Sequence, residues 1–238
     1  MICEGSCYVV FSQAFPIIGN VTALALFCSP VLHSYKIFRN NTIGSYNTLP
    51  NVFAALNCLS WVLYGVIQLN WYLITVNAVG LVLSLFNFMM TLGPLYSTGN
   101  YNNYLLYVIS WLCANITAQL FIFCSCVLVV TGDAKQLVMG YTCIFYLLIF
   151  YASPLQLLFQ VIKEKDARHF YMPFILTCLA NSVAWAFYGF AISDNFVAIP
   201  NSFGILVSLV QLLLSIMYKK ESRKEELLPI DAMDLIEE

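Results

Sequence analysis

The sequence has very little charge. Asp, Glu, Lys and Arg make up only 9% of its 238 residues, whereas soluble domains average about 25%. No charged residue occurs between Asn40 and Gly132. With 61% apolar residues and a mean hydropathy of +0.81, the soluble, fibrous and disordered classes are excluded. These values predict an all-α membrane protein that crosses the bilayer several times, because one spanning helix needs about 20 apolar residues.

The sequence also lacks the residue groupings that catalysis and metal binding require. It contains no Walker motif and no nucleophile–base pair, and Cys124 and Cys126 have no His or carboxylate nearby in the sequence. Most of the nine cysteines lie inside apolar runs, where a free Cys behaves as a small hydrophobe. We therefore expect no enzymatic activity, no metal, no cofactor and no nucleic-acid partner.

Polar breaks divide the apolar runs into seven predicted spans. We place them at residues 14–37, 49–68, 72–92, 104–130, 138–161, 172–192 and 196–218. An odd number of spans puts every Lys and Arg except Lys135 on one side of the membrane. Because these residues concentrate in cytoplasmic loops, we expect the N-terminus outside and the C-terminus in the cytoplasm. Residues 219–238 are expected to form a flexible cytoplasmic tail.

The chain repeats itself at an offset of 124 residues. Residues that rarely match by chance recur in both halves; the matching pairs are Ser29-Pro30 and Ser153-Pro154, Asn57 and Asn181, Trp61 and Trp185, Tyr64-Gly65 and Tyr188-Gly189, Asn77 and Asn201, and Gly80 and Gly204. We therefore predict two three-helix units at residues 14–92 and 138–218, joined by a linker span at 104–130. A single linking helix makes the units parallel repeats, and two such bundles facing each other form a central cavity suited to alternating access.

The repeated polar residues predict a substrate site in this cavity. They come from the second and third spans of each unit and are Asn57, Trp61, Asn77, Asn181, Trp185 and Asn201. Amides donate and accept hydrogen bonds, and an indole face can pack on the C–H surface of a sugar ring. Paired amides and indoles without charge therefore suit a neutral, polyhydroxylated solute. For Asn57 and Asn181, a bond to a neighbouring helix is equally expected, since intramembrane Asn residues often stabilise helix pairs by about 1 kcal/mol.

Prolines and tyrosines near the span ends predict hinges and gates. Four prolines toward the cytoplasmic ends are expected to form a hinge ring, because a helix proline frees a backbone carbonyl and permits a kink. They are Pro30, Pro50, Pro154 and Pro173. Tyr64 and Asp194 lie near the extracellular ends of two spans, where a hydrogen bond between them would close an outer gate. Tyr46, four residues before Pro50, is expected to block the inner side.

Away from their ends, the predicted spans contain no Asp, Glu, Lys or Arg. Coupling to protons or ions usually needs an ionisable residue inside the membrane. We therefore expect passive, uncoupled transport.

These residues and motifs resemble the SWEET family of sugar uniporters. The resemblance covers about residues 14–220 and is strongest at 185–189 (Trp-Ala-Phe-Tyr-Gly) and 196–204 (Phe-Val-Ala-Ile-Pro-Asn-Ser-Phe-Gly). It implies a 3-1-3 arrangement of helices, facilitated diffusion of mono- or disaccharides, and self-association into a homo-oligomer. It also implies that Asn77 and Asn201 bind the sugar, that the two paired tryptophans pack on it, and that the four prolines form the hinge. The outer gate implied by the resemblance is Tyr64 with Asp194.

The resemblance also bears on the size of the sugar. In this family, positions one and two turns before Pro30 and Pro154 line the pocket. Here they are Ala23, Leu26, Leu147 and Phe150. The bulky Leu147 and Phe150 imply a small cavity, so a glucose-like monosaccharide is favoured over sucrose. Asn51 departs from the family, which usually has an aromatic residue there.

Two other functions share part of this pattern. An organelle carrier for amino acids, as in the PQ-loop proteins, usually places an acidic residue in a span, and this chain has none away from the span ends. A seven-span receptor has the same topology but lacks a three-helix repeat. Sugar transport across the plasma membrane bilayer is the leading prediction, with a Golgi or endosomal membrane second.

Overall fold

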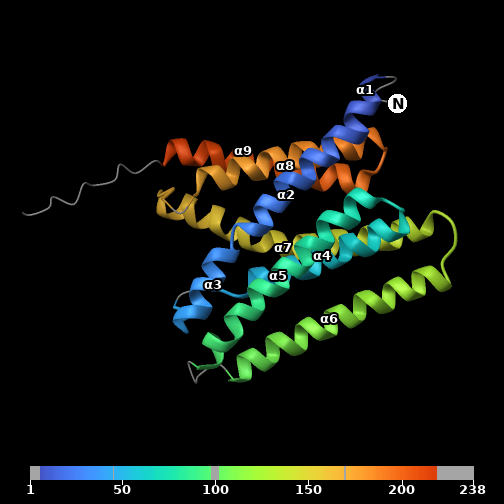
Figure 1. Ribbon diagram of the computed structural model, residues 1–238. Helices are drawn as coiled ribbons and strands as arrows, with labels where there is room; N and C mark the ends of the chain where they lie inside the picture. Colours follow the sequence, from blue (N-terminus) through green and yellow to red (C-terminus); the bar gives the residue numbers. More distant parts are fainter. Residues whose placement is uncertain (1–5, 45, 98–101, 169, 219–238) are drawn as a thin grey trace, which may run out of the picture.

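The computed structural model describes residues 6–44, 46–97, 102–168 and 170–218. Within these ranges every regular element is a helix (Figure 1). Seven stretches are long and apolar enough to cross a membrane, which confirms the prediction of an all-α membrane protein with seven spans. The predicted tail at residues 219–238 lies outside the described residues.

The first span consists of consecutive segments rather than one continuous α-helix. They are the π-helix η1 (Val10–Ala14), α2 (Phe15–Cys28) and α3 (Val31–Asn40), and the short helix α1 (Ser6–Val9) precedes them. The break between α2 and α3 falls at Ser29 and Pro30, because proline has no N–H to donate to the helix ladder. The sequence predicts a kink here. In the structure α2 ends at Cys28 and α3 begins at Val31, and the two residues between them keep right-handed helical backbone angles.

The other six spans are single helices. They are α4 (Leu49–Ile67), α5 (Trp71–Ser97), α6 (Asn102–Leu128), α7 (Ala134–Glu164), α8 (Met172–Ala191) and α9 (Asn195–Met217). The turn after α4 and the turn after α8 each contain a residue with positive φ, Leu69 at 51° and Ser193 at 57°. These two residues are 124 positions apart, so the repeat extends to the backbone shape of the turns.

The helices pack as two similar units, α2–α5 and α7–α9. In the first unit α5 contacts both α4 and the α2–α3 segment, and in the second α9 contacts both α8 and α7. The third helix of each unit therefore lies between the other two. The units meet where α2 packs against α8 and α4 against α7, so the first helix of each unit contacts the second helix of the other. The linker α6 lies beside α4, α5 and α7 (Figure 1), consistent with the 3-1-3 arrangement.

A glycine on the third helix allows each unit to pack closely. At both glycines an added Cβ would lie 3.0 Å or less from side chains of the first and second helices of the same unit. The contacts are Gly80 with Phe27 and Cys58, and Gly204 with Tyr151 and Ser182. Each residue of the Gly80 contact lies 124 positions before the corresponding residue of the Gly204 contact. The repeated glycines are therefore packing positions, as small residues at membrane helix interfaces commonly are.

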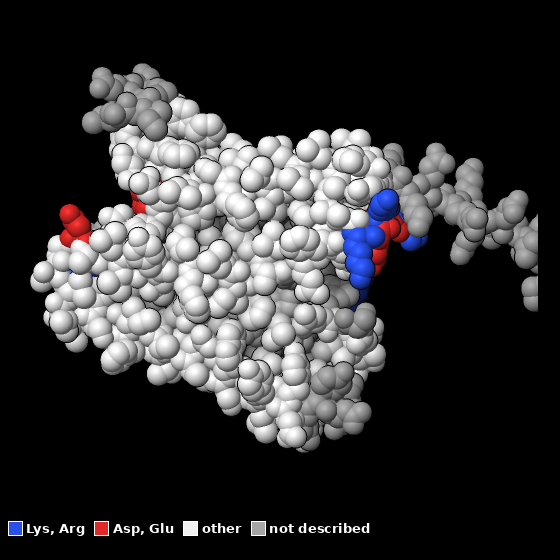
Figure 2. Space-filling view, turned by 180° about the vertical axis from the view of Figure 1, so that it is seen from behind, with Lys and Arg blue, Asp and Glu red and all other residues white. Residues whose placement is uncertain are grey.

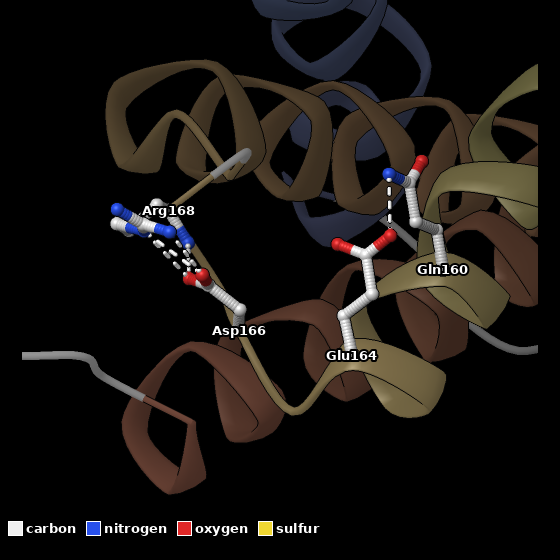
Figure 3. Close-up of polar contacts among 4 residues, drawn as sticks. All are labelled: Gln160, Glu164, Asp166 and Arg168. Atoms are coloured by element: carbon white, nitrogen blue, oxygen red, sulfur yellow. Dashed lines mark hydrogen bonds and ion pairs between the residues drawn. The ribbon is translucent and has the colours of Figure 1, made fainter.

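Basic side chains gather at one end of the molecule (Figure 2), where α3 and α7 end. They are Lys36, Arg39, Lys163, Lys165 and Arg168. Figure 3 shows two polar contacts at this end, one in the loop after α7 and one in the last turn of α7 itself. Arg168 Nη2 lies 2.7 Å from the Asp166 carboxylate, and Gln160 donates to Glu164 at 3.0 Å. Hydrogen bonds to Asp166 and its negative charge raise the pKa of the Arg168 guanidinium, which is protonated at physiological pH even without a partner.

Candidate functional site

Each unit presents a buried Trp–Tyr pair from its second helix. Trp61 and Trp185 expose only 7% and 5% of their surface. Each ring centroid lies 5.7 Å from that of the tyrosine one turn later, Tyr64 or Tyr188, in an edge-to-face arrangement. Trp185 also packs on Gly19 of α2, where a Cβ atom would lie 2.8 Å from the indole Nε1. Both indoles are therefore held in fixed orientations close to where the units meet.

Asn77 on α5 and Asn201 on α9 have the same local geometry. Each is half-buried, and each Nδ2 donates to the backbone carbonyl one turn earlier. The distances are 2.9 Å from Asn77 to Leu73 and 2.8 Å from Asn201 to Val197. These bonds orient the amide planes. Within the described residues no hydrogen bond reaches either Oδ1, so each amide retains an acceptor and one N–H for a ligand.

Asn57 and Asn181 occupy equivalent positions but differ in their bonding. Asn181 Oδ1 accepts a hydrogen bond from Thr22 Oγ1 at 3.1 Å, which joins α8 to α2 across the two units. Asn57 Oδ1 is buried and has no partner among the described residues. A buried acceptor without a donor costs about 1–3 kcal/mol. Asn181 thus bonds to a neighbouring helix, the alternative that the sequence left open, while the Asn57 oxygen is shielded from the surface as well as without a donor among the described residues.

Tyr64 and Asp194 are joined at the end of the molecule opposite the basic loops, and we call them the Tyr64–Asp194 pair. Tyr64 Oη donates to Asp194 Oδ2 at 2.6 Å, and the two residues are only 0% and 5% exposed. Gln136 Nε2 of α7 also donates to Tyr64 Oη, at 3.1 Å. Asp194 Oδ1 accepts from the backbone N–H groups of Phe196 and Val197, so the carboxylate both caps α9 and bonds to the other unit.

Two residues at this end were missed by sequence reasoning. Gln136 has no repeat partner or motif that would have singled it out. Asn70, whose Nδ2 donates to Tyr188 Oη at 2.7 Å, lies 124 residues before Asp194. Comparing the turns as well as the spans at that offset would have found Asn70.

Tyr46 packs within its own unit at the basic end. Its Oη accepts a hydrogen bond from Asn51 Nδ2 at 3.0 Å, and its ring centroid lies 5.1 Å from that of His33. Asn51, where the family usually has an aromatic residue, is therefore the side chain that positions Tyr46.

The four predicted hinge prolines occupy two kinds of position. Pro30 interrupts the first span, and Pro154 lies inside α7. Pro50 and Pro173 lie in the first turns of α4 and α8. Backbone N–H groups in a first turn have no acceptor within the helix, so a proline there removes no helical hydrogen bond. Pro30 and Pro154 can therefore free a backbone carbonyl and permit a kink, whereas Pro50 and Pro173 cannot.

The four residues expected to set the size of the pocket lie on the first helix of each unit. They are Ala23 and Leu26 on α2, and Leu147 and Phe150 on α7. Ala23 is buried and the other three are half-buried. The ring centroid of Phe150 is 6.2 Å from that of Tyr151, the residue that packs on Gly204.

The chemistry available to this site is hydrogen bonding and ring packing. Its side chains are amides, indoles and aliphatic or phenyl groups. Among the residues that the structure describes, no three His, Cys, Asp or Glu side chains are grouped to hold a metal ion. The arrangement therefore suits recognition of a neutral polar solute.

Comparison with known proteins gives consistent results. The family model described as "Sugar efflux transporter for intercellular exchange" matches residues 13–93 and 137–223, once for each unit. The chain is 32% identical over 209 residues to "Bidirectional sugar transporter SWEET5" of Arabidopsis thaliana, covering 86% of this chain and 85% of that protein. It is 29% identical over 216 residues to "Bidirectional sugar transporter SWEET4" of Oryza sativa subsp. japonica, covering 89% and 81%. A solved eukaryotic SWEET transporter superposes with a TM-score of 0.81 at 25% identity, covering 90% of this chain and 99% of that one.

Proposed function

The chain belongs to the SWEET family of sugar transporters, and on this premise we propose that it carries a glucose-like monosaccharide by uncoupled alternating access. The observation that carries the proposal is the matched pair Asn77 and Asn201, whose amide planes are fixed while their oxygens have no partner among the residues that the structure describes. The amino-acid carrier and the receptor lose their support, since sugar-transporter relatives match both units. A transporter also accounts for the lack of catalytic groupings.

In the proposed mechanism the sugar lies between the third helices of the two units. Asn77 and Asn201 bond its hydroxyls from opposite sides. Trp61 and Trp185 pack on the C–H faces of the sugar ring. Contacts with Tyr64 and Tyr188 already hold both indoles in place before the sugar binds. Binding then needs little reorganisation of the protein, which favours affinity.

Alternating access would come from relative motion of the two units. The Tyr64–Asp194 pair would form the first gate pair, on the outer side, and its hydrogen bond would have to break for sugar to enter from that side. Pro30, where the first span is interrupted, is the natural bending point, with Pro154 as its repeat partner. Tyr46 and its neighbours at the basic end would close the inner side when the outer side opens.

We propose the plasma membrane as the location, with the N-terminus outside. The basic ends of α3 and α7 would then lie in the cytoplasm (Figure 2), as the preference of Lys and Arg for cytoplasmic loops requires. A homo-oligomer is proposed from the family resemblance.

Labelled glucose is expected to enter liposomes containing the purified chain when no ion gradient is present. The expectation rests on the absence of charged side chains away from the ends of the spans, which leaves no group to couple sugar to a proton or ion. Empty liposomes give the background. Uptake that appears only after a proton gradient is imposed would contradict uncoupled transport, and the absence of flux for all neutral sugars would contradict the proposed function.

Phe150→Ala is expected to raise the ratio of sucrose flux to glucose flux about tenfold, because removing a phenyl ring enlarges the pocket by more than one methylene equivalent. The ratio is measured in the same liposomes. Phe159→Ala is the matched control, since Phe159 lies on the same helix with 67% of its surface exposed. An unchanged ratio in Phe150→Ala, or an equal rise in Phe159→Ala, would remove Phe150 from the pocket.

A further inference from the structure

A second hydrogen bond crosses between the units at the outer end. Asn70 Nδ2 donates to Tyr188 Oη at 2.7 Å. This length is similar to the 2.6 Å of the hydrogen bond from Tyr64 to Asp194. Asn70 is the repeat counterpart of Asp194, and Tyr188 is the counterpart of Tyr64. Each bond therefore joins the tyrosine of one unit to the turn of the other.

The two turn residues also have the same second bond. Asn70 Oδ1 accepts from Leu73 N at 3.3 Å, and Asp194 Oδ1 accepts from Val197 N at 3.3 Å. Leu73 and Val197 are again 124 residues apart. In both turns one side-chain atom caps the third helix, which fixes the side chain, and the other atom reaches the opposite unit.

The two bonds differ in charge and direction. The Asp194 carboxylate accepts a hydrogen bond from the Tyr64 hydroxyl, whereas the Asn70 amide donates a hydrogen bond to the Tyr188 hydroxyl. An amide in place of a second carboxylate keeps the repeated arrangement and avoids placing two negative charges at one narrow end, where they would repel each other. The neutral bond is also independent of ionisation.

We infer that Asn70 and Tyr188 form a second gate pair, and that the outer side opens only when both pairs separate. Because each of the two hydrogen bonds joins one unit to the other, separating the units at this end breaks both bonds. The gate therefore has one charged and one neutral half. This inference rests on the proposed alternating-access function but is tested without sugar.

The test is hydrogen exchange of the full chain in lipid nanodiscs, measured for peptides covering the turns at residues 68–74 and 192–198. Asn70→Ala is expected to raise exchange about fivefold at 192–198, in the opposite unit, since a net hydrogen bond contributes about 1 kcal/mol to closure. Tyr188→Phe, which removes only the hydroxyl and leaves the Asn70 cap intact, is expected to raise exchange by a similar factor at 68–74. Tyr64→Phe is expected to raise it more at both turns, because its acceptor is charged.

Tyr72→Phe is the matched control. Tyr72 Oη donates to Gln13 of η1 at 2.6 Å, so this variant loses an equally short bond beside the same turn that does not reach the second unit. The Phe side chain keeps the ring that packs on Tyr188, at a centroid distance of 5.8 Å. Exchange at 192–198 should stay at the wild-type rate. If Asn70→Ala changes only 68–74, or Tyr188→Phe leaves 68–74 unchanged, Asn70 is a helix cap alone and the second gate pair is refuted. Sugar flux of the wild type is measured separately, so a chain without flux would refute the proposed function while the exchange result still decides the gate.

Discussion

Asn77→Ala and Asn201→Ala are each expected to lower glucose flux ten- to hundredfold. Each amide retains two bonding groups for a sugar hydroxyl, and losing one or two such bonds costs about 1.4–2.8 kcal/mol. The flux is measured in liposomes loaded with equal amounts of each variant. Similar losses for both variants are expected, because the two amides have the same intrahelical bond.

Asn115→Ala provides the control for losing an intramembrane amide. Asn115 Nδ2 donates to the Trp111 carbonyl at 2.8 Å, the same local bond, but its Oδ1 already accepts from Tyr146. We expect its flux to stay within about threefold of wild type, since its oxygen is already bonded to Tyr146 and it lies on the linker α6, outside the two units. Wild-type flux in both Asn77→Ala and Asn201→Ala would move the binding site elsewhere, and an equal loss in Asn115→Ala would attribute the effect to folding.

Gly189→Ala is expected to destabilise the fold strongly. The new Cβ would lie 2.5 Å from the backbone nitrogen of Ala198 and 2.8 Å from its Cα. Because a backbone cannot turn aside as a side chain can, α8 and α9 must separate, at a cost of about 1–3 kcal/mol. The expected result is a clear fall in melting temperature and in the yield of monodisperse protein, measured in detergent.

Gly93→Ala is the matched substitution at a glycine with open space. No atom lies within 4 Å of the Cβ it would add to α5, and alanine favours a helix over glycine by about 1 kcal/mol. Its melting temperature should equal or exceed that of wild type. Gly65→Ala should fall between the two, since its nearest neighbour is the Ile74 side chain at 2.9 Å. Equal melting of the Gly189 and Gly93 variants would show that the close approach of α8 and α9 is not what limits stability.

Composition and periodicity alone determined the class and the organisation of this protein. Insertion into a bilayer depends on the local density of apolar and charged residues, which can be counted along the chain, and the seven spans follow from that count. Internal duplication is also a property of the sequence itself, so the pairing of Asn77 with Asn201 and of Trp61 with Trp185 could be predicted before any contact was known. The resemblance to sugar transporters rests on those same segments.

The tertiary structure decided which of the equivalent residues share the same bonds. Asn181 bonds to Thr22 while Asn57 has an unpaired buried oxygen, although the sequence treats the two alike. The bonds of Asn70 to Tyr188 and of Gln136 to Tyr64 likewise appear only in the folded chain. The physical reason is that these contacts depend on how far each helix is rotated and how closely it approaches its neighbour. Those quantities follow from packing over the whole molecule, and no local pattern specifies them.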